Sequence, residues 1–427
     1  MSLPATPANP LKGGLDSPPA GNRFVGTFSC IFSNFPYAHP MTITPYLPIY
    51  RRTGIRIARG EGAYLIDDQG KRYLDFASGI AVNAFGHSHP HLVEALQKQA
   101  AKIWHCSNQF VTEELEIFAA RLVEQTFADS VFFCSSGTEA VEAGLKFLRR
   151  YHYETGAPYR QRIITFEGGF HGRTYGGIAA GGNASARAGF GPMLLGFDRV
   201  PYNDIDAVKH TINKNTAGIL IEPIQGEGGV QVASHAFLRE LRALCDAEGL
   251  LLMCDEVQCG YGRPGSFYAF EQAGITPDIV SSAKGIGGGF PLGATLVTEK
   301  VGSVLPAGSH GGTYNNNPLA MAVGNAALDL LLTDGLFEQV KTIGAYLTDG
   351  LKKLQAQHPD KITDVRGVGL MIGLQPVGDA RVLAAALLEK GLVTSPTVTN
   401  VIRLVPPLII DRTHADAALS ALSETLA

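Results

Sequence analysis

Residues 250–294 have the sequence LLLMCDEVQCGYGRPGSFYAFEQAGITPDIVSSAKGIGGGFPLGA, and the fold expected for the whole chain follows from them. They begin with an apolar run, Leu250 to Met253, that is typical of a buried strand in a parallel sheet and that leads directly to Asp255. A second apolar step, Ile279–Val280, leads to Lys284 and a run of glycines. Open parallel sheets bind ligands at the carboxyl ends of their strands, so the acid and the lysine should face one ligand.

A lysine and an acid at two such strand ends suit pyridoxal phosphate. The amine of Lys284 can bond to the cofactor's aldehyde, while the carboxylate of Asp255 keeps the pyridine nitrogen protonated so that the ring can accept electrons from a carbanion. Gln258 leaves the same strand end and is the candidate for the ring hydroxyl. The alternative is an ordinary strand-end acid and a surface lysine.

The composition favours a large globular protein with small-molecule chemistry. The 427 residues are 45% hydrophobic and 17% charged, which is enough apolar material for a large core and for two or three domains. The net charge of -4 is spread without basic blocks, so we expect neither nucleic acid nor membrane as a partner. The six cysteines are scattered and lack the spacing of a metal site. We therefore expect no disulfide framework, no metal and a cytoplasmic location.

Small polar residues follow another predicted strand, Val131–Cys134, just before a long predicted helix. Ser136, Gly137 and Thr138 would place unpaired backbone N–H groups and the positive end of the helix dipole at one point, an arrangement that binds phosphate. A serine that only caps the helix would give the same pattern. Beside Lys284, we interpret this turn as the site of the cofactor's phosphate.

Two long motifs, DEVQxGxGR at 255–263 and PDIxxxAKGxGGGFPxGA at 277–294, resemble the class III (omega) aminotransferases, most closely their acetylornithine branch. The similarity extends from about residue 50 to the C-terminus. It implies a fold-type I enzyme that depends on pyridoxal phosphate, with a large α/β domain around a mainly parallel sheet and a smaller α+β domain. Strand-then-helix units with their motifs at the strand ends favour a parallel α/β sheet independently.

The resemblance also assigns substrate-binding and cofactor-binding roles. In the motif FHGRT, Phe170 would stack on the cofactor ring and Arg173 would bind a substrate carboxylate. The flat apolar face of phenylalanine suits a pyridine ring, and the guanidinium fork of arginine suits a carboxylate. In EPIQGE, Glu227 would pair with a switchable arginine. Arg403, in NVIRLVPPL, matches the family's second carboxylate-binding arginine. A core phenylalanine and a surface arginine are the alternative for the first motif.

Two further residues are implied by the resemblance. The turn GGTYNNNP is similar to one whose threonine, here Thr313, reaches the cofactor phosphate of the neighbouring subunit, which implies a homodimer with shared active sites. The family has glycines where this chain has Asn315 and Asn316, and asparagine tolerates positive φ better than most residues. Tyr50 matches a tyrosine that ornithine aminotransferases use on the substrate carboxylate, with a structural tyrosine as the alternative.

The predicted elements divide the chain into four segments. Residues 1–45 are rich in Pro, Gly, Ser and Asn and are expected to be a poorly ordered arm. Residues 46–90 would form the N-terminal part of the small domain, 91–317 the large cofactor-binding domain, and 318–427 a linker helix and the C-terminal small domain. In that last segment we expect helices at 336–358 and 380–390, strands at 365–374 and 401–404, and a final helix capped by Thr413.

The resemblance implies an enzyme that transfers the terminal amine of N-acetylornithine to 2-oxoglutarate, giving N-acetylglutamate semialdehyde and glutamate in arginine biosynthesis. A 4-aminobutyrate or ornithine aminotransferase is the alternative within the class, because it would share the same lysine, acid and arginines. An aminomutase on the same fold is the alternative from another class, but it has no use for a switchable second carboxylate site. A non-catalytic carrier would be expected to lose Lys284.

Overall fold

The computed structural model describes residues 46–427, so the predicted N-terminal arm, 1–45, lies outside the described residues. The chain consists of two units, one ending at Ile55 and the other spanning Arg56–Ala427. Residues 46–55 form neither helix nor strand, and Tyr50 is exposed there, with the guanidinium carbon of Arg52 5.9 Å from its ring centroid. All the helices and strands of the described chain belong to Arg56–Ala427.

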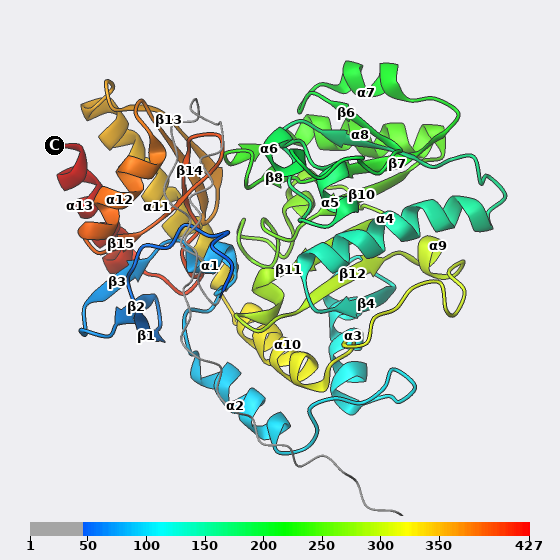
Figure 1. Ribbon diagram of the computed structural model, residues 1–427, viewed down its shortest axis with the longest axis horizontal. Helices are drawn as coiled ribbons and strands as arrows, with labels where there is room; N and C mark the ends of the chain where they lie inside the picture. Colours follow the sequence, from blue (N-terminus) through cyan, green and yellow to red (C-terminus); the bar gives the residue numbers. More distant parts are fainter. Residues whose placement is uncertain (1–45) are drawn as a thin grey trace, which may run out of the picture. The chain divides into compact units, whose positions relative to one another are not determined.

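A seven-stranded sheet forms the right-hand part of Figure 1, in the order β4-β12-β11-β10-β7-β5-β6. Neighbouring strands pair in parallel from β11 to β6, whereas β12 runs antiparallel to both β11 and β4. The mainly parallel sheet confirms the predicted fold class, and β12 is an element that the sequence did not indicate. The strands are β4 (Ser130–Cys134), β5 (Arg162–Phe166), β6 (Phe197–Val200), β7 (Thr216–Ile221), β10 (Leu251–Asp255), β11 (Ile279–Ala283) and β12 (Gly293–Val297).

Helices cover both faces of this sheet, which explains why its central strands are apolar without interruption. On β10, Leu251 and Met253 pack into one core cluster with α4 (Gly137–Glu154). Leu252 and Cys254 belong to a second cluster with α8 (His235–Glu248). Successive side chains of a strand point to opposite faces, so an unbroken apolar run is required when both faces are buried.

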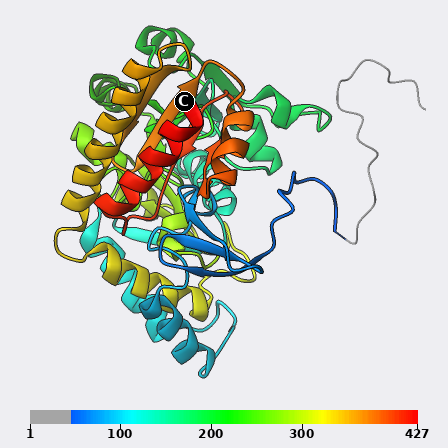
Figure 2. The ribbon, with the colours of Figure 1, turned by 90° about the vertical axis from the view of Figure 1, so that its left-hand side faces the viewer.

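The C-terminal part of the chain forms a second group of elements, on the left of Figure 1. A four-stranded sheet has the order β13-β14-β17-β16, with β13 (Ile362–Val368), β14 (Met371–Pro376), β16 (Ser395–Pro396) and β17 (Ile402–Leu404). The helices α11 (Leu336–Gln357) and α13 (Arg412–Leu426) pack against each other and lie side by side in Figure 2. The remaining helix of this group is α12 (Ala380–Glu389).

The N-terminal strands are completed by a C-terminal one. The sheet β1-β2-β3-β15 joins β1 (Ile57–Glu61), β2 (Tyr64–Asp67) and β3 (Arg72–Asp75) to β15 (Leu392–Val393). The strand β15 pairs in parallel with β3, which places Leu392 opposite Leu74. Residues near both ends of Arg56–Ala427 therefore share one sheet.

Two of the C-terminal predictions were wrong. The expected single strand at 365–374 is a hairpin of β13 and β14, because the backbone turns between Val368 and Met371, which pair with each other, and Gly369 in that turn has a φ of +56°. The expected cap of the last helix, Thr413, lies inside α13, and Asp411 is the cap instead. Its carboxylate accepts from the backbone N–H of His414 at 3.1 Å.

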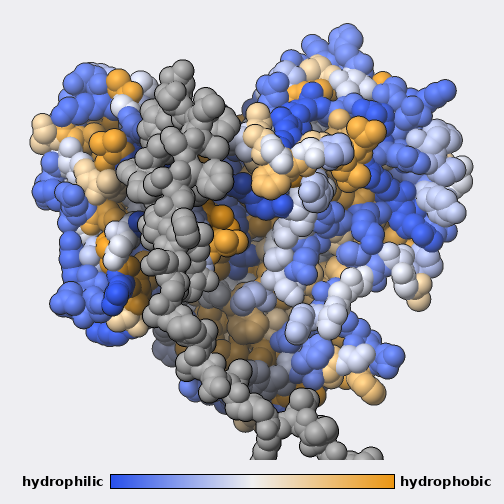
Figure 3. All heavy atoms as spheres, viewed as in Figure 1, coloured by the Kyte–Doolittle hydropathy of each residue, from blue (hydrophilic) through white to orange (hydrophobic). Residues whose placement is uncertain are grey.

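The described chain contains no single helix long and apolar enough to cross a membrane. The helices α10 (Pro318–Leu331) and α11 meet that criterion of length and composition only as a pair bent by 69°. Most residues of α10 are buried, and the helix packs against α2 (Pro90–Ala100) and α3 (Glu113–Gln125). On the face drawn in Figure 3, hydrophilic residues cover most of the outer surface and hydrophobic residues form scattered patches.

Candidate active site

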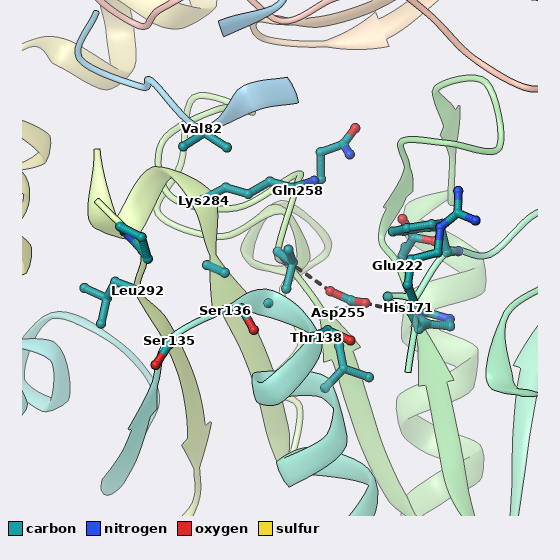
Figure 4. A pocket seen from close by; sticks show the side chains of 18 of the residues that line it. Val82, Ser135, Ser136, Thr138, His171, Glu222, Asp255, Gln258, Lys284 and Leu292 are labelled. Atoms are coloured by element: carbon teal, nitrogen blue, oxygen red, sulfur yellow. Dashed lines mark hydrogen bonds and ion pairs between the residues drawn. The ribbon is translucent and has the colours of Figure 1, made fainter. Parts of the chain in front are cut away.

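A cavity of about 430 Å³ lies at the carboxyl edge of the seven-stranded sheet (Figure 4). Most of the predicted site residues line it: Ser136, Gly137, Thr138, Phe170, Arg173, Asp255, Gln258 and Lys284. Glu227 and Arg403 contact Gln258 at its border. Thr313 is exposed and does not line this cavity, and Tyr50 belongs to the other unit.

Asp255 is the last residue of β10 and is only 3% exposed. One carboxylate oxygen accepts from the backbone N–H of Val257 at 3.1 Å, and the other lies 2.8 Å from Nδ1 of His171 (Figure 4). Burial lowers the pKa of His171, but the hydrogen bond to Asp255 and the charges of Asp255 and Glu222 outweigh it, so the pKa is raised. His171 and Asp255 thus form a buried, hydrogen-bonded pair at the end of β10.

Lys284 follows β11 with a backbone φ of +53°, a left-handed conformation that costs a residue other than glycine about 1 kcal/mol or more. Burial, together with the charge of Arg403, lowers the pKa of Lys284 to about 8, against the opposing charges of Glu227, Asp255 and Glu222. A lysine amine with a pKa near neutrality is a better nucleophile and base than an ordinary lysine.

The start of α4 forms the floor of the cavity beside β4. Ser136 caps the helix, with its Oγ accepting from the backbone N–H of Glu139 at 3.4 Å. Gly137 is the first helical residue, and a Cβ there would lie 2.7 Å from Cγ1 of Val257, so a larger residue would not fit without a shift. The free N–H groups of this first turn and the helix dipole can hold a phosphate.

Phe170 and Arg173 lie on the loop after β5. The backbone N–H of Phe170 donates to Oε1 of Glu222 at 2.7 Å, which fixes the start of this loop against β7. The exposed Arg173 has its guanidinium carbon 5.6 Å from the Phe170 ring centroid. Burial raises the pKa of Glu222 to about 7. The aromatic ring and the guanidinium are thus adjacent at the wall of the cavity.

Arg403, on β17, is almost fully buried and belongs to a different sheet from the cavity strands. Its Nη1 donates to Oε1 of Glu227 at 2.5 Å and to Oε1 of Gln258 at 2.7 Å, and its Nη2 donates to Oγ of Ser395 at 2.9 Å. Burial raises the pKa of Glu227, but the charge and hydrogen bond of Arg403 outweigh this effect and lower the pKa. The predicted pair of Glu227 and Arg403 is therefore in contact.

Several residues that line the cavity were not singled out from the sequence, among them Val82, His171 and Glu222. His171 stands next to Phe170 in FHGRT, and Glu222 is the first acid of EPIQGE, so both motifs contained the signal. Their roles depend on contacts with residues 84 and 52 positions away along the chain. No local pattern marks Val82.

The residues around the cavity suit pyridoxal phosphate. A buried acid beside an imidazole can hold a pyridinium nitrogen, the start of α4 can hold a phosphate, and Lys284 can bond to an aldehyde carbon. The cavity of about 430 Å³ is within the range usual for small-molecule sites, roughly 300–1,000 Å³. The fold and the site together define a fold-type I enzyme that depends on pyridoxal phosphate.

Comparison with known proteins identifies the family. Residues 48–426 match the family aminotransferase class III, and the chain belongs to it. The chain is 50% identical over 383 residues to an acetylornithine aminotransferase of Agrobacterium fabrum (strain C58 / ATCC 33970), covering 90% of this chain and 96% of that protein. This confirms the predicted family, and the protein is a pyridoxal-phosphate-dependent aminotransferase.

Solved structures share the fold. An acetylornithine aminotransferase from Elizabethkingia anophelis has a TM-score of 0.79 at 35% identity, with 89% of this chain and 95% of that chain covered. An ornithine aminotransferase from Toxoplasma gondii, with partial occupancy of pyridoxal phosphate at its active site, has a TM-score of 0.85 at 30% identity, with 89% and 91% covered.

Proposed function

We propose that this enzyme transfers the terminal amino group of N-acetylornithine to 2-oxoglutarate, giving N-acetylglutamate semialdehyde and glutamate in arginine biosynthesis. The contact between the buried Arg403 and the partly buried Glu227 near Lys284 carries the proposal, because Arg403 can bind a second substrate carboxylate and Glu227 can occupy it when that carboxylate is absent. The relatives at about 50% identity that act on acetylornithine support this choice of donor.

The residues of the cavity have separate tasks in this reaction. Pyridoxal phosphate, when bound, supplies the sink for electrons released at the substrate carbon. Lys284 Nζ removes the proton from the substrate carbon that bears the reacting amine, because its lowered pKa leaves part of it neutral near pH 7. Asp255, held by His171, keeps a positive charge on the ring nitrogen, and Phe170 orients the ring.

The two substrates use the two arginines, Arg173 and Arg403, differently. N-acetylornithine presents a reacting amine far from its single carboxylate, so Arg173 at the wall of the cavity is enough to hold it. Glutamate reacts at its α-carbon, which places one carboxylate at Arg173 and the other beside the reacting centre, at Arg403. Glu227 neutralises Arg403 while the first substrate reacts and moves away for the second, because a buried charge without a partner is costly and would attract the wrong carboxylate.

A panel of amino donors tests this function. With 2-oxoglutarate as the acceptor, kcat/KM is measured for N-acetylornithine, ornithine, 4-aminobutyrate and succinyl-diaminopimelate. We expect the value for N-acetylornithine to exceed the others by at least about tenfold, a difference that contacts to one polar group can supply. A higher value for 4-aminobutyrate or ornithine would replace this proposal with the alternative activity on the same residues.

We also propose a homodimer in which Thr313 completes the phosphate site of the partner subunit. Thr313 lies on a surface formed by two segments of the chain that hydrogen bonds connect, one around Asn108 and the other around Thr313. Asn316 donates to Oδ1 of Asn108 at 3.0 Å, and Asn108 donates to the carbonyl of Gly312 at 2.9 Å. Asn316 has a φ of +58°, so asparagine adopts the backbone that glycine would otherwise supply. This surface exposes large apolar side chains, which favours burial against another chain; they are Trp104, Phe110, Val111 and Tyr314.

Hybrid dimers test the shared site. If Thr313→Ala is inactive alone, mixing it with inactive Lys284→Ala should restore activity, because one site of each hybrid then has both residues intact. Mixing two samples of Lys284→Ala is the control and should restore none. A catalytically competent monomer, observed by sedimentation at the assay concentration, would contradict the proposal.

A further inference from the structure

Arg263 and Arg403 are the two arginines that are almost fully buried in the described chain, at 2% and 1% exposure. Arg403 has an acidic partner, but Arg263 forms no ion pair with any described residue. Its Nη1 donates to the carbonyls of Leu370 at 3.1 Å and Pro406 at 2.6 Å, and its Nη2 is buried without a partner among the described residues. Burial lowers the pKa of Arg263 to about 9. Burying a cation without a counter-charge costs stability, and the two hydrogen bonds to carbonyl oxygens offset part of that cost. The positions of these two carbonyls show which segments Arg263 holds together.

The two carbonyls lie opposite each other at the end of one pair of strands. In the antiparallel pairing of β14 with β17, Gly373 is opposite Arg403 and Ile372 is opposite Leu404. The same register places Leu370 opposite Pro406, just beyond the last paired residues. Arg263 therefore binds both strands just beyond the end of this ladder. Its contact with β17 is at Pro406, three residues after Arg403.

The backbone of Arg263 holds the same place. The N–H of Leu370 donates to the carbonyl of Arg263 at 3.0 Å. A Cβ on Gly369 would lie 2.5 Å from that carbonyl oxygen, and Gly369 has a φ of +56°, so the turn between β13 and β14 fits tightly against Arg263. Side chain and backbone together attach this turn to residue 263.

The loop that carries Arg263 begins at the cavity. It leaves β10 at Asp255 and includes Gln258, whose side-chain oxygen accepts from Nη1 of Arg403 at 2.7 Å. One loop thus contacts the β17 segment at two points, Arg403 and Pro406. Three residues of a strand span about 10 Å, so two contacts at this separation resist both sliding and tilting of β17.

We propose that Arg263 is a positioning residue that fixes β17 against the cavity loop, so that Arg403 meets Glu227 and the second carboxylate of a dicarboxylate substrate. This inference rests on the proposed function, in which Arg403 binds that carboxylate. Arg263 does not line the cavity, so it acts through the segments that it contacts, the end of β17 and the turn between β13 and β14. A shift of about 1 Å in a binding group can cost on the order of 100-fold in rate, and loss of the clamp should therefore affect the dicarboxylate selectively.

Arg263→Gln and Arg263→Lys test the inference, with Arg242→Gln as the matched control. Arg242 is also a mostly buried arginine of this unit; it donates to the carboxylate of Asp278 at 2.8 Å and to the carbonyl of Thr276 at 3.3 Å, away from the cavity. For each variant, KM for 2-oxoglutarate, the single-turnover rate with N-acetylornithine and the affinity for glutarate are measured. Glutarate binding, followed by calorimetry, reports the second carboxylate site without turnover.

We expect Arg263→Gln to raise KM for 2-oxoglutarate by about tenfold or more and to weaken glutarate to a similar degree, with less than about a threefold change in the N-acetylornithine rate. Arg263→Lys keeps a cation that can reach one carbonyl and should lie between Arg263→Gln and wild type. Arg242→Gln should lower Tm without separating the two substrates.

Equal losses with both substrates, or an unchanged KM for 2-oxoglutarate and unchanged glutarate affinity, would overturn the inference. If Arg263→Gln does not fold, Arg263→Lys decides by the same criteria. Arg403→Ala, measured in parallel, distinguishes failure of the positioning role of Arg263 from failure of the proposed role of Arg403. If it impairs 2-oxoglutarate while the Arg263 variants resemble wild type, only the positioning role fails; if it does not, the proposed role of Arg403 fails and the inference with it.

Discussion

The cofactor side of the cavity and the Arg403 side are built in different ways. Asp255 ends β10 and Lys284 directly follows β11, the strand paired with β10, and the turn at Ser136 follows β4 of the same sheet. Arg403 comes from another sheet and meets Glu227 and Gln258 across 176 and 145 positions of the chain. The first arrangement is held by backbone hydrogen bonds within one sheet, whereas the second depends on how two sheets are held against each other.

This difference explains how one cavity can serve two substrates. In the proposed function, the groups that both half-reactions need, Asp255 and Lys284, are at one edge of a single sheet. In the proposed function, Arg403 is the group that only the dicarboxylate needs; it is on a separate strand and pairs with a carboxylate of the protein, Glu227. Variants on the cofactor side should therefore impair both half-reactions alike, and variants on the Arg403 side should separate them.

The largest effect is expected for Lys284→Ala. Loss of the base should lower the rates of both half-reactions by at least about 1,000-fold, since the other groups of the cavity cannot move the proton. The protein should still bind pyridoxal phosphate through Asp255 and the start of α4. The measurement is single-turnover kinetics with each substrate.

Lys300→Ala is the control for Lys284→Ala, because Nζ of Lys300 lies 3.0 Å from Oδ1 of Asp278, away from the cavity. Its rates should stay near those of wild type. Normal turnover by Lys284→Ala would refute the assignment of the base, and a loss confined to one half-reaction would break the comparison between the two sides.

A smaller but still symmetric loss is expected for Asp255→Asn. An amide cannot hold a positive charge on the ring nitrogen, so both half-reactions should slow by about 100-fold or more. Asp278→Asn is the matched control, since Asp278 is also a buried carboxylate, bound to the backbone N–H of Leu252 at 2.8 Å and to Arg242. It should lower stability and leave the rates per folded molecule nearly unchanged. Near-normal kcat in Asp255→Asn with the cofactor bound would show that the acid has no electronic role.

The smallest effect concerns Glu256, in the loop that joins the two sides. Its Oε1 accepts from the backbone N–H of Phe270 at 2.9 Å, and its Oε2 accepts from Sγ of Cys259 at 3.1 Å. Burial raises the pKa of Glu256 from 4.5 to about 7. The unfolded state therefore loses its proton first as pH rises, and the free energy of unfolding should fall between about pH 4.5 and 7 by about 3 kcal/mol and then stay level.

Glu256→Gln removes this ionisation, so its free energy of unfolding should change less between pH 5 and pH 8 than that of wild type. The remaining change comes in part from Glu222, whose pKa is raised in the same direction. Denaturant unfolding at the two pH values measures it, and both half-reactions should keep their ratio. An identical pH dependence in the two proteins would rule out Glu256 as the source.

Local sequence patterns were sufficient for the cofactor side. The strand predicted at Val131–Cys134 is observed as β4, Ser130–Cys134, and β10 delivers Asp255 as its apolar run indicated. The hairpin at 362–376 was missed because residue types alone do not show where the chain reverses; the pairing of Val368 with Met371 and the positive φ of Gly369 reveal the turn. Asp411 and Thr413 are both good helix caps by residue type, and only the capping box formed with His414 separates them.

Contacts between distant segments were beyond local patterns. The sequence marked Arg263 as part of a motif, but its partners, Leu370 and Pro406, lie 107 and 143 positions away. The same holds for His171 and its partner Asp255, 84 positions apart. Arg403 and Glu227 were paired from the family resemblance rather than from spacing. The parts that could be predicted are those in which one strand end supplies several groups.

Single-turnover rates of the two half-reactions in Arg403→Ala and Glu227→Ala test most directly whether the two sides are separable. We predict that Arg403→Ala slows the reaction with 2-oxoglutarate by about 100-fold, with less than about a threefold change for N-acetylornithine, because only the dicarboxylate needs the buried guanidinium. Glu227→Ala should favour reaction of glutamate at its α-amine relative to reaction of N-acetylornithine at its terminal amine. Equal losses in both half-reactions for both variants would contradict the account and make the pair an ordinary part of the scaffold.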